Sequence, residues 1–233
     1  VKVTFAPGTS HYAAVRYARD RNSQPSGSPR TAISSWAHST NTYDSLNVNH
    51  NWVVGPSSLN ELVFQYSKFV NDIPPAKGGP TLILANQVIL GANPAASQRT
   101  EQEKWQFRDD FSWTTAGFGG LAHELKAGVN WVHEPVLRVH TGQGLDGLFF
   151  FGTNDLNGPI VRAMRIGGDP TANLPLDLYG LYVQDDWRAT DRLTLNLGVR
   201  WDYVTGMPID QSESPNFLPM QAAGRAGRFD GTI

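Results

Sequence analysis

The chain has 233 residues, a formal net charge of −2 and no cysteine. A single domain is the first expectation at this length, the balanced charge gives no indication of nucleic acid, and disulfide or thiolate chemistry is excluded. No stretch reaches the roughly 18–20 uninterrupted apolar residues of a membrane helix. Crossing by β-strands stays open, because only every second residue of such a strand faces lipid.

The strand pattern begins at once, with Val1, Val3 and Phe5 alternating with polar neighbours before a turn at 7–9. A period of two indicates a strand with one apolar and one wet face, so 1–20 is the first predicted strand pair. A long polar stretch follows, and the second predicted pair covers 42–71.

The next long connection contains residues 81–90 (TLILANQVIL), which fit a short strand or a helical turn equally well. The third predicted pair covers 104–133 and has a Gly-rich connection in its middle. The connection after it contains the apolar run 148–151, which fits an exposed ligand-contacting patch or a strand extension.

The fourth predicted pair, residues 177–205, has the clearest alternation. Strands in soluble proteins usually have about five or six residues, whereas a membrane-spanning strand needs roughly 9–11. These strands are long enough to cross a bilayer. One side of the last strand carries only bulky apolar residues, namely Leu193, Leu195, Leu197, Val199, Trp201 and Tyr203.

Eight strands therefore alternate between short turns and long connections. Structureless connections of this length are unusual in compact soluble domains, whereas outer-membrane barrels combine tight periplasmic turns with long extracellular loops. The predicted fold is all-β: a segment of an antiparallel transmembrane β-barrel, formed by about eight long strands in a strongly curled meander sheet.

The segment YVQDDWRATDRLTLNLGVRWDY (182–203) resembles a strand-turn-strand motif of TonB-dependent outer-membrane receptors, closest to the branch with an N-terminal carboxypeptidase-regulatory-like domain. Weaker matches are GPSSLNELVFQYS (55–67), FSW (111–113) and LKAGVNW (125–131). The resemblance implies part of a wall of about 22 strands around a plugged lumen. It implies active uptake of a scarce solute, such as a siderophore or a carbohydrate, across the outer membrane of a Gram-negative bacterium.

The partners implied by the resemblance are outer-membrane lipid, the remaining barrel strands, a plug domain and, through the plug, the TonB complex. The chain shows no plug domain, no TonB-contact segment and no signal-peptide pattern. We therefore expect 1–233 to be one partial barrel domain, a piece that does not transport by itself.

Large aromatic residues fall near the ends of the predicted strands, where a barrel has its interfacial girdles. The inner-rim candidates precede short turns: Trp52, Trp113 and Trp187. The outer-rim candidates lie on the loop side: Trp131, Tyr179, Trp201 and Tyr203. The alternative is that they fill the core of a soluble sandwich.

Charged residues on the wet parity are the lumen-facing candidates, where they could meet a plug, water or solute. The alternative is a cross-strand ladder that only holds the register. The candidates are Arg108, Asp110, Glu124, Lys126, Asp186, Arg188, Arg200 and Asp202.

Two aspartates, Asp109 and Asp185, fall on the lipid-facing parity. Their position near the interface, where a charge is less costly, or a parity-reversing bulge would account for them. In addition, if Trp187 pairs with Leu193, then Tyr182 is expected to cover Gly198.

No catalytic constellation is found, so we expect no enzyme activity, no cofactor and no metal. The histidines are scattered, and the spacing of His133, Glu134 and His140 fits no familiar ligand pattern. Neither Ser67 nor Ser112 lies in a nucleophile motif.

Two other readings stay open. A complete eight-stranded anchor or adhesin barrel predicts hydrogen bonds between the first and last strands. A soluble carbohydrate-binding β-sandwich predicts that Leu195, Leu197 and Val199 are covered by a second sheet.

Overall fold

The computed structural model describes residues 1–116, 122–142 and 144–206. Within these ranges the only helix is the 3-10 turn η1 (Ile33–Ser35), and no helix has the length and hydropathy to span a membrane. The strands of the large sheet are β1 (Lys2–Phe5), β2 (His11–Ser26), β3 (Ala37–Gly55), β4 (Ser58–Ile73), β7 (Gln98–Ala116), β8 (Ala122–Thr141), β11 (Thr171–Asn173), β12 (Leu176–Thr190) and β13 (Leu193–Thr205).

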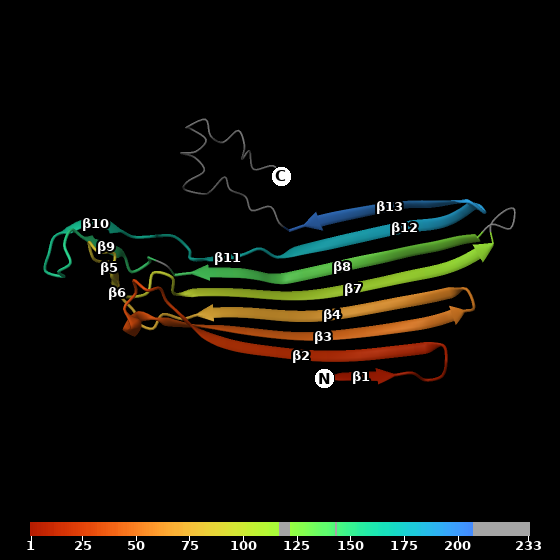
Figure 1. Ribbon diagram of the computed structural model, residues 1–233, viewed down its shortest axis with the longest axis horizontal. Helices are drawn as coiled ribbons and strands as arrows, with labels where there is room; N and C mark the ends of the chain where they lie inside the picture. Colours follow the sequence, from red (N-terminus) through yellow and green to blue (C-terminus); the bar gives the residue numbers. More distant parts are fainter. Residues whose placement is uncertain (117–121, 143, 207–233) are drawn as a thin grey trace, which may run out of the picture.

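The large sheet is an antiparallel meander in the order β1-β2-β3-β4-β7-β8-β12-β13, with the short β11 also paired to β8. Figure 1 shows the strands side by side, with β1 and β13 at opposite edges. Short turns lie at one end of the sheet and the long connections at the other; we call these the turn end and the loop end. Since β1 and β13 are not paired, the described residues form an open sheet and not a closed eight-stranded barrel.

The strands are longer than predicted, and the added length lies at the loop end. β7 begins at Gln98 instead of 104, and β8 continues to Thr141 instead of 133. The added part of β7, Gln98–Glu103, is polar on both faces, and the added part of β8 has apolar residues at adjacent positions, Val136 and Leu137. Because neither face carries a regular apolar row, the period of two that predicted the strand centres is absent there.

The register separates the large sheet into two faces. The apolar face carries the odd-numbered residues of β12 and β13, and the polar face carries their even-numbered residues. The buried side of the large sheet is the polar one, as expected for the concave face of a curled sheet, where side chains crowd together. Its buried residues in the described chain are Ala14, Ala37, Ser39, Ser67, Asp110, Gly128, Glu134 and Gly180.

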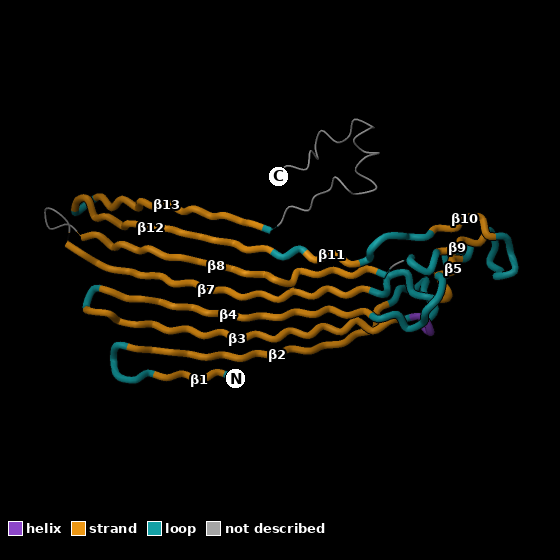
Figure 2. Tube along the Cα trace, turned by 180° about the vertical axis from the view of Figure 1, so that it is seen from behind, coloured by secondary structure: helices purple, strands orange, loops and turns teal. Residues whose placement is uncertain are grey.

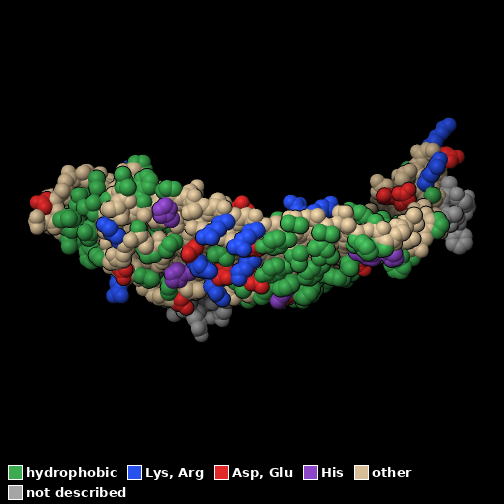
Figure 3. All heavy atoms as spheres, turned by 90° about the horizontal axis from the view of Figure 1, so that it is seen from below, with side chains coloured by type: hydrophobic (Ala, Val, Ile, Leu, Met, Phe, Trp, Pro, Cys, Tyr) green, Lys and Arg blue, Asp and Glu red, His purple; other side chains and the backbone are tan. Residues whose placement is uncertain are grey.

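The apolar face is not covered by a second layer. Leu181 is 49% exposed, Leu197 54% and Val199 73%. Figure 3 shows hydrophobic side chains gathered between a mid-molecule cluster of charged side chains and the turn end. A β-sandwich core would bury these residues, so the soluble sandwich reading is not supported.

The long connections form a second, smaller sheet at the loop end (Figure 2). Its order is β10 (Ile160–Met164), β9 (Leu148–Phe151), β5 (Thr81–Ile83) and β6 (Ile89–Gly91), and β5 runs parallel to β9. The ambiguous segment 81–90 is thus a strand pair, and the run 148–151 is a strand. We call this unit the loop sheet.

The pairing of β12 with β13 differs from the predicted one by two residues. Trp187 pairs with Leu195, which places Tyr182 opposite Arg200 and Gln184 opposite Gly198. The expectation that Tyr182 covers Gly198 is therefore wrong. The reason lies at the turn, where β12 continues to Thr190 with a register irregularity between Arg188 and Thr190.

Candidate functional site

Aromatic side chains form two staggered rows that bound the apolar face. On β12, Tyr179 lies toward the loop end and Trp187 toward the turn end. Their eight-residue separation corresponds to about 27 Å along a strand, comparable to the apolar band of about 25 Å on outer-membrane barrels. All seven aromatic candidates project from the apolar face: Trp52, Trp113, Trp131, Tyr179, Trp187, Trp201 and Tyr203.

Trp105 extends the loop-end row and was missed by the sequence reasoning. It shares the apolar face with Trp113, eight residues further along β7, and is 37% exposed. Its ring packs against Tyr66 at a centroid distance of 4.4 Å. Trp105 lies next to the register irregularity between Glu103 and Trp105, but its parity with Trp113 was a usable signal.

The two aspartates on the apolar face are each held by a cross-strand partner. The Asn60 side-chain amide donates to Asp109 at 2.7 Å, and His123 Nδ1 lies 2.7 Å from Asp185 Oδ2. The strand pairings run without a shift through both positions, so a parity-reversing bulge is not the explanation. The His123 ring also stacks on Trp187 with an interplanar angle of 7°.

We expect His123→Ala to destabilise the folded protein by about 1–3 kcal/mol, because it leaves the Asp185 carboxylate without its partner. The other Asp185 oxygen, Oδ1, is already buried without a hydrogen bond. The double variant His123→Ala/Asp185→Ala should recover part of this loss. Urea unfolding in phospholipid vesicles measures both, and a double variant no more stable than His123→Ala would contradict the pairing.

On the polar face, Asp110 is the centre of a charged cluster. Its carboxylate accepts a 2.7 Å hydrogen bond from the Tyr182 hydroxyl and lies 3.3 Å from Arg108 Nε and 3.7 Å from Lys126 Nζ. Lys126 also reaches Glu61 at 3.8 Å. We call these five residues the Asp110 cluster; Asp110 itself is only 3% exposed.

Gly128 makes room for the Asp110 cluster. It pairs with Asp110 on one side and with Tyr182 on the other. A Cβ at this position would meet both the Asp110 carboxylate and the Tyr182 ring far inside contact distance. The glycine that Tyr182 covers is thus Gly128 on β8. Sequence parity alone could have found Glu61, but not the Tyr182 contact, which depends on the register between β8 and β12.

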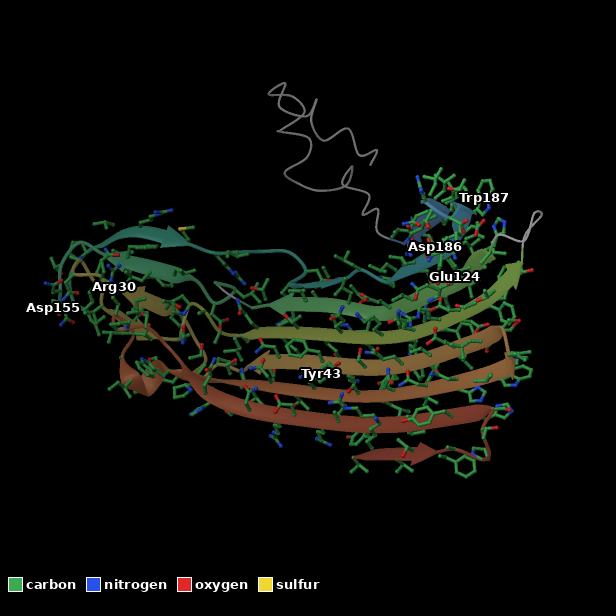
Figure 4. All side chains as sticks on the ribbon, turned by 45° about the vertical axis from the view of Figure 1, so that its right-hand side comes forward. Arg30, Tyr43, Glu124, Asp155, Asp186 and Trp187 are labelled. Atoms are coloured by element: carbon green, nitrogen blue, oxygen red, sulfur yellow. The ribbon has the colours of Figure 1, made fainter. Side chains whose placement is uncertain are left out.

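The eight charged candidates all project from the polar face, but only Arg108, Asp110 and Lys126 belong to one cluster. Arg200 and Asp202 form a separate two-bond ion pair at 2.7 Å. Figure 4 shows Glu124 and Asp186 at the turn end, where they are directly opposite each other. Arg188 bonds the turn residue Asp191 at 3.1 Å.

The possible metal ligands His133, Glu134 and His140 have separate partners. His133 Nδ1 lies 2.8 Å from Asp177, Glu134 accepts from Gln102, and His140 contacts Thr171. The described part of the chain contains no group of three or more potential ligands that could hold a metal ion.

The family model described as outer membrane beta barrel domain matches residues 1–232. The chain belongs to this family. The predicted fold class and the outer-membrane location are confirmed by this match, and the open meander agrees with a partial barrel. The comparison with curated proteins gave no match.

Solved structures of large outer-membrane proteins have a similar fold. The outer membrane transporter YddB from Escherichia coli matches with a TM-score of 0.64 and 13% identity, over 88% of this chain and 26% of its own. FpvA of P. aeruginosa, solved with heterologous pyoverdines, matches with a TM-score of 0.60 and 14% identity, over 89% of this chain and 30% of its own. The siderophore receptor PirA from Acinetobacter baumannii matches with a TM-score of 0.54 and 14% identity, over 88% of this chain and 28% of its own. The chain thus spans less than a third of these proteins.

Proposed function

We propose that the chain forms about a third of the barrel wall of a TonB-dependent outer-membrane transporter, a barrel of about 22 strands. The observation that carries the proposal is the uncovered apolar face bounded by two aromatic rows. Contact with the hydrocarbon of a bilayer stabilises such a face, because the lipid shields its apolar side chains from water. The likeness in fold to YddB, FpvA and PirA supports the assignment.

In this arrangement the polar face lines the lumen and the aromatic rows lie at the two membrane interfaces. The turn end then faces the periplasm and the loop end the cell exterior, because barrels of this type have short periplasmic turns. The Asp110 cluster is part of the lumen wall, in reach of a plug domain or a passing solute. We infer a transport role without enzyme activity, which the likeness in fold to an outer membrane transporter and a siderophore receptor supports.

The proposal is tested by expressing the receptor that contains this segment, with an epitope tag, in a Gram-negative host. We expect it in the outer-membrane fraction, with heat-modifiable migration in detergent gels. Solute uptake should be lost when the host TonB protein is deleted. A covalent inhibitor that reacts with catalytic nucleophiles should leave uptake unchanged. Recovery in the soluble fraction would contradict the membrane assignment, and uptake that persists without TonB would contradict energised transport.

A further inference from the structure

The polar face of β1 to β4 contains a hollow of about 570 Å³. Small side chains form its floor, because β2 places Ala14 and Ala18 on this face and β3 places Ser45 there. Tyr43, labelled in the middle of the sheet in Figure 4, is one of the residues that line the hollow. Its size lies within the range of about 300–1,000 Å³ that is usual for small-molecule sites. The remaining lining residues are Lys2, Arg16, Asn47, Asn49 and Gln65.

The hollow carries positive charge and no lining acid. Its two charged residues, Lys2 and Arg16, have no ion-pair or side-chain hydrogen-bond partner in the described part of the chain. The cations of the other half of the polar face differ, since Arg108 and Lys126 contact Asp110 and Arg200 contacts Asp202. Among the described cations on the polar face of the large sheet, Lys2 and Arg16 are therefore the ones that no acidic side chain neutralises.

Neutral hydrogen-bonding groups surround these two cations. Within the described residues, Tyr43, Ser45 and Gln65 show no side-chain hydrogen bond, and Asn49 donates only to Asn47, at 2.6 Å. Hydroxyl and amide groups can both donate and accept. Together with the guanidinium of Arg16, which suits a carboxylate, they match a ligand that carries carboxylates and hydroxyls.

We propose that this hollow is a binding subsite on the lumen wall for a hydroxyl-bearing carboxylate solute. The proposal rests on the proposed transport function and names the chemistry of its solute. Arg16 and Lys2 bind the carboxylates, while Tyr43, Gln65 and the asparagines bind the hydroxyls. Two sources share this chemistry, namely acidic sugars and hydroxycarboxylate chelates of iron.

The test uses the whole receptor, purified in detergent, and isothermal titration with three probes: trigalacturonate, ferric citrate and the neutral maltotriose. We expect one or both anionic probes to bind, and maltotriose to bind at least tenfold more weakly. Arg16→Gln should weaken the anionic probe about tenfold, and Lys2→Gln/Arg16→Gln should weaken it further. The matched control is Arg21→Gln, which removes the same charge from the opposite face of β2 and should leave binding unchanged.

The three probes distinguish the possible ligands of the hollow. Binding of trigalacturonate alone identifies an acidic sugar, and binding of ferric citrate alone identifies an iron chelate. The proposal would be overturned if maltotriose bound as tightly as the anionic probes, or if Arg21→Gln weakened binding as much as Arg16→Gln. It would also be overturned if neither anionic probe bound, and the hollow would then be a contact for another part of the receptor. Outer-membrane fractionation and heat-modifiable migration of each variant show separately whether the barrel itself assembles, which is the test of the proposed function.

Discussion

Replacing Val183 by arginine is expected to destabilise the folded protein by about 2–4 kcal/mol, the cost of a cation near the middle of the lipid face of a barrel. Val183 lies on β12 midway between Tyr179 and Trp187 and is 48% exposed on the apolar face. An arginine there is too far from either interface to place its charge in water. The loss is measured by urea unfolding of the receptor refolded in phospholipid vesicles, together with its yield in the outer-membrane fraction.

The neighbouring substitution Gln184→Arg is the matched control. Gln184 follows Val183 in the same strand but projects from the polar face and is exposed. An arginine there meets water or the lumen, so its effect should be small. If Val183→Arg unfolds at the same urea concentration as the parent, or if the two variants lose equal stability, the apolar face does not contact hydrocarbon.

The difference between these neighbours was predictable from the sequence, because a strand alternates sides whatever its partners are. Parity therefore separated the aromatic from the charged candidates, and the strand pairings place the two groups on opposite faces of the sheet; their contact with lipid or lumen stays a prediction. It also showed Asp109 and Asp185 as exceptions, though not why they are tolerated. Their partners, Asn60 and His123, are 49 and 62 residues away in the chain.

Features that depend on register or on distant segments could not be derived in this way. The contact of Tyr182 with Asp110 joins strands 72 residues apart, and the predicted pairing was wrong by two residues at a turn with an irregular register. The loop sheet brings together 81–83 and 148–151 from separate connections. Short strands of this kind have too few residues for periodicity to identify them.

Asp110→Ala is expected to cost about 2 kcal/mol of folding stability, mainly because the Tyr182 hydroxyl loses a charged acceptor and a nearly buried site is left with two cations. The ion pairs contribute less to this loss, since Arg108 is 48% exposed and the distances to Arg108 and Lys126 are 3.3 and 3.7 Å. Asp110→Asn, which keeps an acceptor oxygen for Tyr182, should lose clearly less stability. Urea unfolding in vesicles compares the two variants.

Asp202→Ala is the control, because it removes an acidic group from the same face but from an exposed ion pair, with side-chain exposures of 56% and 45% for Arg200 and Asp202. Exposed pairs contribute little, so no clear loss is expected. Equal effects of Asp110→Ala and Asp202→Ala would mean that the Asp110 cluster is only one more exposed cross-strand contact. If Asp110→Ala loses more stability than Asp202→Ala, and Tyr182→Phe reproduces part of that loss, the loss is assigned to the Tyr182–Asp110 hydrogen bond, which joins β7 to β12 across β8.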